Sequence, residues 1–199
     1  LNILENFNLE KEGHNSANSI HLLSESMKRA YADRTRFHGD PDYFEVPIKG
    51  MIDKDYSKKR ADSISLEKTT PSNEIYPGDF KVMDESPDTT HFSVIDSEGN
   101  AVSNTYTLGS SFGSGVTVPG AGFLLNNQMR NFSHQYGKSQ KIGLSTSPAN
   151  KLEPGKRMIS TQTPTMVFTK GADLFMVLGS PGGGRIPNIV SQVVSNVID

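Results

Sequence analysis

The sequence predicts an α+β fold in which helices cover a mostly antiparallel β-sheet. Two alternating, β-branched stretches, each folded back on itself by turn residues, predict two β-hairpins. Apolar residues at helical spacing lie before the first hairpin and after the second. With 18 glycines and 11 prolines among 199 residues, and 34% hydrophobic residues, we expect a loop-rich chain near the upper size of one ordinary domain.

The first helix is predicted near residues 16–36. Its apolar positions recur at helical spacing, and Asn15, Ser16 and Ser19 are candidates for its N-terminal cap. Three arginines in its C-terminal half could suggest catalysis, but charges near a helix end usually face solvent or compensate the helix dipole. We therefore expect no catalytic role for Arg29, Arg34 and Arg36.

A second, shorter helix is predicted to begin at Asp53, which can cap it, and to run to about Ile64. Residues 41–50 before it are predicted to form a loop. Residues 66–87 are polar and contain three prolines, which predicts a mobile linker. Such a linker would give the chain a flexible approach to Thr89.

The first hairpin is the centre of the sequence. Its strands are predicted at residues 89–96 and 101–107, joined by the turn Ser97-Glu98-Gly99-Asn100. If the bond before Thr89 were cut, the new α-amino group, with a pKa of about 7.7–8.0, could accept the proton of the threonine's own hydroxyl. One residue would then be nucleophile and base. Taken alone, a Thr-Thr pair at a strand edge is more often explained by β-propensity.

The rest of the chain alternates between loops and short apolar elements. Residues 109–122 are predicted to form a glycine-rich loop, and residues 123–125 a short strand that ends at Asn126, Asn127 and Gln128. Residues 133–155 have few apolar side chains, which predicts a lid or long surface loop. A second hairpin is predicted at residues 165–178, and a final helix after the glycines, with Pro187 in its first turn.

Composition excludes several classes of function. The formal net charge of −2 gives no electrostatic case for binding nucleic acid or an anionic membrane surface. No stretch approaches the length of apolar sequence that spans a bilayer. The absence of cysteine excludes disulfides, thiolate metal sites and a cysteine nucleophile, and it leaves the redox compartment undetermined.

The order of the motifs is more informative than any one of them. From Thr89 onward they are Thr89-Thr90-His91-Phe92-Ser93-Val94, Phe112-Gly113-Ser114-Gly115, Asn126-Asn127-Gln128-Met129, Lys156-Arg157, Ser160-Thr161-Gln162-Thr163-Pro164 and Gly179-Ser180-Pro181-Gly182-Gly183. This series resembles the small subunit of the gamma-glutamyltranspeptidases, N-terminal nucleophile enzymes that cut themselves to mature. The resemblance implies a four-layer αββα sandwich, of which this chain is a fragment. Residues 1–88 resemble the end of a large subunit, and residues 89–199 resemble a small subunit truncated at its C-terminus.

The resemblance assigns a nucleophile and the residues around it. It implies self-cleavage between Asp88 and Thr89, with Thr89 as the nucleophile and Thr107 as the threonine that hydrogen-bonds it. It implies an oxyanion hole at Gly182 and Gly183, where glycines before a helix let amides approach a ligand closely. From the residues alone, Thr107 is more simply an inward strand residue. A phosphate-binding loop at these glycines is a weaker interpretation, because the Lys-Ser/Thr ending is missing.

The resemblance also assigns substrate contacts, and two positions depart from it. Ser160 and Thr161 match the hydroxyls that hold the substrate α-carboxylate, and Gln128 matches a contact to the α-amino group. Gly109 stands where the family usually has an asparagine, and Asn131 where it usually has an aspartate. Losing the carboxylate that faces an ammonium removes a charge-assisted hydrogen bond. We therefore expect weaker recognition of an α-ammonium and a shift toward acyl groups such as glutaryl.

Three functions follow from these observations. The first is a self-processing gamma-glutamyltransferase or hydrolase of γ-glutamyl amides such as glutathione, with water or an amine as acceptor. It would work as a large and small subunit heterodimer, without a metal or organic cofactor, and relatives are periplasmic, secreted or at the cell surface. The second is an acylase for glutaryl amides of the cephalosporin type, or an enzyme that processes poly-γ-glutamate. The third is an uncleaved, inactive homologue that acts as a binding protein.

Overall fold

The computed structural model describes residues 1–75, 89–133 and 147–198. The chain divides into two compact units. The helical unit comprises residues 1–83, 130–159 and 195–199, and the hairpin unit comprises residues 84–129 and 160–194. Most of the predicted linker, and residues 134–146 of the predicted lid, lie outside the described residues.

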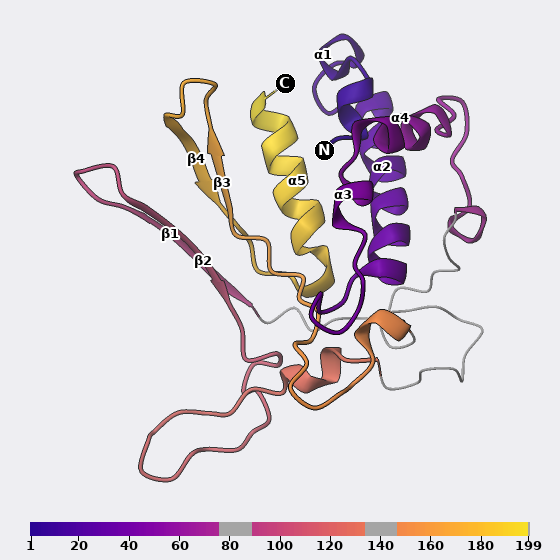
Figure 1. Cartoon of the computed structure of the whole chain (residues 1–199). Helices are drawn as coiled ribbons and strands as arrows, with labels where there is room; N and C mark the ends of the chain where they lie inside the picture. The colour runs from indigo at the N-terminus through magenta and orange to yellow at the C-terminus, as the bar shows by residue number, and fades with distance from the viewer. Residues whose placement is uncertain (76–88, 134–146, 199) are drawn as a thin grey trace. The chain divides into compact units, whose positions relative to one another are not determined.

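The helical unit is built on one long helix, α2 (Ala17–Phe37) (Figure 1). This helix begins where predicted, because the Ser16 hydroxyl accepts a hydrogen bond from the Ser19 amide at 3.1 Å. Helix α4 (Lys54–Asp62) is also confirmed, with the Asp53 carboxylate accepting from the Tyr56 amide at 2.8 Å. The remaining elements are short: η1 (Leu4–Asn6), α1 (Leu9–Glu12), α3 (Ile48–Met51) and η2 (Ser72–Glu74).

The helical unit differs from the prediction at residues 41–50. The predicted loop ends in the helical turn α3, whose Met51 amide bonds to the Pro47 carbonyl at 2.9 Å. Proline suits the position before a helix because it has no amide hydrogen to satisfy there. An apolar core of this unit is formed by Leu22 of α2 together with Leu4 and Ile64.

Arg29 contradicts the expectation that the α2 arginines face solvent. Only 2% of it is exposed, and its guanidinium pairs with the Glu25 carboxylate at 2.7 Å and donates to the Ser63 carbonyl at 2.7 Å. Glu25 is fully buried and also accepts from Lys28 at 2.6 Å. Burial alone would raise the pKa of Glu25, but the hydrogen bonds from Lys28, Arg29 and Thr70 outweigh it and lower the pKa to about 2. Arg29 is therefore structural, as expected, but through a buried ion pair.

The described end of the predicted lid is buried in its first part, residues 147–150, and mostly exposed at residues 151–155. It contains the 3₁₀ turn η5 (Pro148–Asn150), in which Ala149 and Asn150 have 0% exposure. The Asn150 side chain donates to the Asn131 carbonyl at 2.6 Å and accepts from the Ile159 amide at 3.2 Å. A polar sequence is buried here because one amide side chain satisfies the backbone groups around it.

The helical unit joins segments that lie far apart in the sequence. Asp40 is 4% exposed and accepts from both the backbone amide and the Nε of Arg157, at 2.8 and 2.9 Å. These hydrogen bonds hold the pKa of Asp40 well below its usual range. Nearby, the Tyr43 hydroxyl donates to the Pro154 carbonyl at 3.0 Å. The segment after α2 is thereby fixed to residues 154–157.

The hairpin unit contains the two predicted hairpins. Strands β1 (Thr90–Ile95) and β2 (Ala101–Tyr106) pair antiparallel, as do β3 (Thr165–Phe168) and β4 (Leu174–Leu178). In the described residues each hairpin is its own two-stranded sheet. Hydroxyl side chains connect them in place of a backbone ladder. Ser103 donates to the Leu178 carbonyl at 2.9 Å and accepts from the Thr165 amide at 3.1 Å.

Helix α5 (Ile186–Ile198) lies along the second hairpin (Figure 1). Its buried residues Ile186, Val190 and Val194 pack on side chains of β3 and β4, namely Val167, Met176 and Leu178. The helix follows the 3₁₀ turn η6 (Gly183–Arg185), and Pro187 lies in its first turn as predicted.

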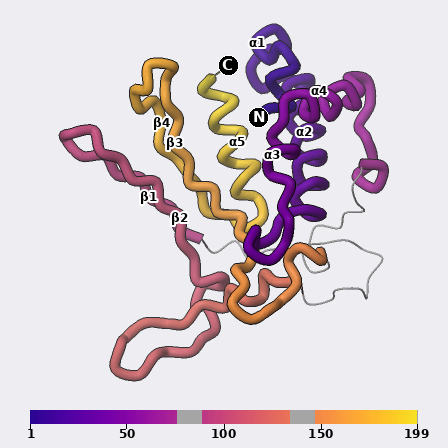
Figure 2. Tube along the Cα trace, viewed as in Figure 1, coloured from indigo at the N-terminus to yellow at the C-terminus, as the bar shows by residue number. Residues whose placement is uncertain are grey.

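The segment between β2 and residue 127 leaves the hairpin and returns, as Figure 2 shows. Its two arms are joined by backbone hydrogen bonds, including Val118 to Phe123 and Leu125 to Val116, both 2.9 Å. The predicted strand at residues 123–125 is wrong, because only an isolated bridge between Thr117 and Leu124 forms. The 3₁₀ turn η3 (Gln128–Asn131) follows.

Candidate active site

The predicted nucleophile lies at the open end of the first hairpin. Thr89 is half-buried and directly precedes β1, whose first residue, Thr90, pairs with Tyr106. The strand pairing stops there, and one further pair in the same register would join Thr89 and Thr107. Residues directly opposite in an antiparallel pair have Cβ atoms about 4.5–5.5 Å apart, within reach of two short hydroxyl side chains. Asp88, the predicted other side of the cleaved bond, lies outside the described residues.

Thr107 is held by the turn that follows it. Its hydroxyl oxygen accepts from the Gly109 amide at 2.9 Å, and its carbonyl accepts from the Gln128 side chain at 3.3 Å. The turn therefore brings together Thr107 and Gln128, two of the predicted site residues. The Gly109 contact uses the Thr107 hydroxyl as an acceptor.

Gly109 is glycine for a local reason. Its φ is +97°, a conformation that side chains disfavour, and a Cβ there would lie 2.0 Å from the Asn127 side-chain oxygen. That same oxygen accepts from the Ser110 amide at 3.1 Å, and the Asn127 amide donates to the Ser110 hydroxyl at 3.0 Å. Asn127 thus occupies the space next to position 109 and fixes the turn.

The predicted oxyanion glycines lie between β4 and α5. Gly182 and Gly183 both have positive φ, +131° and +54°, and Gly183 is buried. The Arg185 amide bonds to the Gly182 carbonyl at 3.1 Å, which starts the turn into α5. Conformations of this kind are available to glycine at little cost. A helix N-terminus after such a turn favours negative charge.

The remaining predicted substrate residues lie in two different units. Ser160 is exposed and Thr161 half-buried, just before β3, and the Ser160 hydroxyl accepts from the Gln162 amide at 3.1 Å. Both belong to the hairpin unit with Thr89, Thr107, Gln128 and the glycines. Asn131 belongs to the helical unit, where its carbonyl accepts from Asn150. The roles of all these residues in binding stay predictions.

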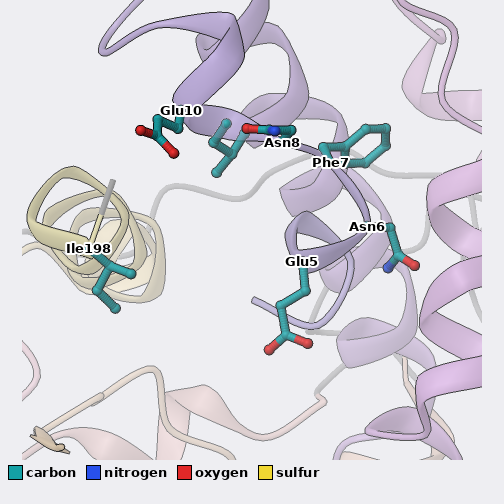
Figure 3. A pocket seen from close by; sticks show the side chains of 7 residues that line it. Glu5, Asn6, Phe7, Asn8, Glu10 and Ile198 are labelled. Carbon is teal, nitrogen blue, oxygen red and sulfur yellow. The ribbon is translucent and has the colours of Figure 1, made fainter.

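One polar pocket lies elsewhere, in the helical unit (Figure 3). Its lining contains none of the predicted site residues and consists of Glu5, Asn6, Phe7, Asn8, Leu9, Glu10 and Ile198. Within residues 1–75, 89–133 and 147–198, no group of three or more His, Asp or Glu side chains is arranged to hold a metal ion.

Sequence reasoning missed the side chains that join the two hairpins. His91, Ser93 and Ser103 all connect to the end of β4. A usable signal exists, because His91 and Ser93 alternate along β1 and share one face of the strand. What that face touches is decided by residues far along the chain, which periodicity does not reveal.

Comparison with known proteins identifies the family of this chain. The family model described as Gamma-glutamyltranspeptidase matches residues 1–199. The chain belongs to the gamma-glutamyltranspeptidase family. It is 46% identical over 199 residues to the glutathione hydrolase proenzyme of Escherichia coli K12, covering all of this chain and 34% of that protein. It is 37% identical over 199 residues to the acylase ACY 1 proenzyme of Pseudomonas sp. SE83, covering 33% of that protein.

The solved structures place the chain in the N-terminal nucleophile hydrolase fold. Cephalosporin acylase from Bacillus halodurans matches with a TM-score of 0.75 and 25% identity, over 100% of this chain and 32% of that one. The predicted fold class is thereby confirmed. The chain spans about a third of the length of the curated relatives that it matches. No helix among the described residues has the length and apolar character to cross a bilayer.

Proposed function

We propose that this gamma-glutamyltranspeptidase family member belongs to a self-processing hydrolase or transferase of γ-glutamyl amides, with Thr89 as its nucleophile. The observation that carries the proposal is the position of Thr89. It directly precedes β1, next to the pair Thr90 and Tyr106, in a chain whose whole length matches the family. The glutathione hydrolase proenzyme relatives support glutathione-like substrates.

Maturation would begin with Thr89 attacking the carbonyl carbon of Asp88. The peptide bond is exchanged for an ester, which water hydrolyses, leaving a new carboxylate at Asp88 and a free α-amine at Thr89. A single chain becomes two subunits in this way. The proenzyme relatives support such processing.

Turnover would use the same hydroxyl. The free α-amine accepts its proton, the oxygen attacks the γ-carbonyl of the substrate, and the amide hydrogens of Gly182 and Gly183 stabilise the oxyanion. The amine product leaves with a proton, which gives a threonyl ester. Water or an acceptor amine then attacks that ester, and its proton passes through the α-amine to the threonine oxygen as the acyl group leaves, which restores the hydroxyl.

A second candidate keeps this chemistry and changes the acyl group. Gly109 has no side chain to contact a substrate amine, and the Asn127 side chain fills the space that a larger residue at position 109 would need. Asn131 supplies an amide where the family pattern has a carboxylate. Both features favour acyl groups without an α-ammonium, such as glutaryl. The 37% identity to an acylase supports the same direction.

The test uses the protein at its full natural length. Intact mass and N-terminal sequencing should give a fragment that begins Thr-Thr-His-Phe-Ser. Thr89→Ala should stay uncut, and Thr89→Ser should be cut and active, because serine keeps the hydroxyl. A wild-type chain that stays uncut after long incubation at neutral pH would contradict the proposal and favour an inactive, binding homologue.

The choice of acyl group is tested separately, on processed protein. Hydrolysis of γ-glutamyl and glutaryl anilides is compared by kcat/KM. A glutaryl anilide cleaved at least as fast as the γ-glutamyl anilide would support the acylase. A much faster γ-glutamyl anilide would support the glutathione hydrolase.

A further inference from the structure

The imidazole of His91 lies between the two hairpins of the hairpin unit. It projects from the second residue of β1, on the strand face that Thr89 shares by alternation. Its Nδ1 lies 2.7 Å from the Thr105 hydroxyl, which is in a residue only 8% exposed, and its Nε2 lies 3.0 Å from the Ser93 hydroxyl. Both ring nitrogens therefore have partners on the first hairpin.

The other side of the ring meets backbone at the end of β4. A Cβ at Gly179 would lie 2.2 Å from His91 Nδ1 and 2.3 Å from Cε1, a separation that atoms do not tolerate. The chain passes directly against the imidazole because position 179 has no side chain. Gly179 is the residue at which the chain leaves β4 for the predicted oxyanion glycines.

The hydrogen bonds also fix the tautomer of the ring. The Ser93 hydroxyl has one proton, which it donates to the Val177 carbonyl at 3.3 Å. Its contact with His91 must then be one that it accepts, so the ring proton is on Nε2. Nδ1 consequently accepts from the Thr105 hydroxyl. The result is a continuous chain of hydrogen bonds from β2, through the imidazole, to the backbone of β4.

We propose that His91 is a positioning residue, which sets the distance between the Thr89 hydroxyl and the amides of Gly182 and Gly183. Thr89 lies two residues before it, and the glycines lie three and four residues beyond the Gly179 contact. This inference rests on the proposed function of those residues. Oxyanion donors act at about 2.7–3.1 Å, and a displacement of about 1 Å can reduce a rate by about 100-fold.

The first experiment separates kcat from KM. In His91→Ala, measured on fully processed protein and on the better of the two anilides, we expect kcat to fall by about 10- to 100-fold with little change in KM. Ser160 and Thr161, the predicted carboxylate contacts, are themselves unaltered in this variant. His91→Asn should recover part of the rate, since its side-chain oxygen can accept from Thr105 in place of Nδ1. His14→Ala, which alters an exposed histidine of the helical unit, is the matched control.

Gly179→Ala tests the same contact from the opposite side. The added methyl displaces the intact imidazole, so the variant should lose kcat as His91→Ala does. In the double variant that combines His91→Ala with Gly179→Ala, kcat should fall no further than in the more impaired single variant, because both substitutions disrupt the same contact. Additive losses, or a loss in KM alone, would refute the positioning role.

A readout independent of activity separates this inference from the proposed function. Amide hydrogen exchange of residues 179–185 should be faster in His91→Ala than in wild type, and unchanged in His14→Ala. Unchanged exchange would refute the inference even in an active enzyme. Faster exchange in a protein whose wild type hydrolyses neither anilide would refute the proposed function, while supporting the contact between His91 and the glycine segment.

Discussion

Neutralising one buried carboxylate is expected to destabilise the helical unit strongly. Glu25 is fully buried in α2 and accepts from Lys28 at 2.6 Å, from Arg29 at 2.7 Å and from the Thr70 amide at 3.2 Å. Glu25→Gln keeps the shape and part of the hydrogen bonding but removes the charge. Two cations would then lack their anionic partner, one of them the 2%-exposed Arg29.

The magnitude follows from the pKa of the carboxyl. A shift from 4.5 to about 2, at 1.36 kcal/mol per pKa unit, gives about 3 kcal/mol of stability at neutral pH. Because the pKa is lowered by folding, this contribution is present above pH 4.5 and disappears as the pH falls from 4.5 toward 2. The cost of Glu25→Gln should therefore be about 3 kcal/mol at pH 7 and much smaller near pH 2.

Hydrogen exchange of peptides that cover α2 measures the local opening free energy at each pH. The matched control is Glu5→Gln, which breaks the exposed pair of Glu5 with Lys54 and should cost less than about 1 kcal/mol. If Glu25→Gln opened α2 no more readily than Glu5→Gln at pH 7, the buried pair would not stabilise the unit. A cost that did not change with pH would refute the role of the carboxylate charge.

Three further predictions concern single sites, each measured by hydrogen exchange of the surrounding peptides. Asp40→Asn should accelerate hydrogen exchange of the peptides around residues 40 and 157, because Arg157 loses its buried anionic partner and keeps only the exposed Asp42. Gly109→Ala should lower the free energy of unfolding more than Gly120→Ala does. Both positions have positive φ, so both variants carry about 1–3 kcal/mol of backbone strain, but only a side chain at position 109 also collides with Asn127. If the two variants were destabilised equally, the Asn127 side chain would move aside without loss of stability. Ile186→Ala, at a residue 1% exposed, should destabilise α5 by about 2–5 kcal/mol, and a loss below 1 kcal/mol would contradict its place in the core.

Local signals in the sequence predicted the regular elements well. Ser16 and Asp53 cap the helices that they were expected to cap, because capping needs only residues three apart. The first hairpin formed around Gly99, whose φ of +85° suits its turn. At residues 123–125 a short apolar run was the one signal for a strand, and the predicted strand was wrong. Hydrogen bonding there forms one bridge and no sheet.

Burial of polar groups was beyond local reasoning. Arg29 is buried because Glu25 and Ser63 meet its guanidinium, and Ser63 lies 34 residues away. Asn150 is buried because backbone groups at residues 131 and 159 converge on it. Contacts of this kind depend on which segments the fold brings together, and residue spacing carries no such information.

The candidate site also has residues that the sequence predicted and contacts that it did not. The family motifs predicted Thr89 and the glycines as site residues, and the pairing of Thr90 with Tyr106 brings the ends of β1 and β2 together next to Thr89 and Thr107. No motif indicated that His91 would support the backbone at Gly179, since the two residues lie in different hairpins. Supporting contacts of this kind become visible only when the hairpins are seen together.

The Asp40 contact has a consequence for the cut protein. Asp40 and Tyr43 lie before the proposed cleavage position, and their partners Arg157 and Pro154 lie after it. Cleavage at Thr89 would turn these contacts from intramolecular ones into contacts between two separate polypeptides. The two polypeptides would then associate by mass action, so the stability of the helical unit would depend on protein concentration. Dilution would favour their dissociation, which cannot occur in a single chain.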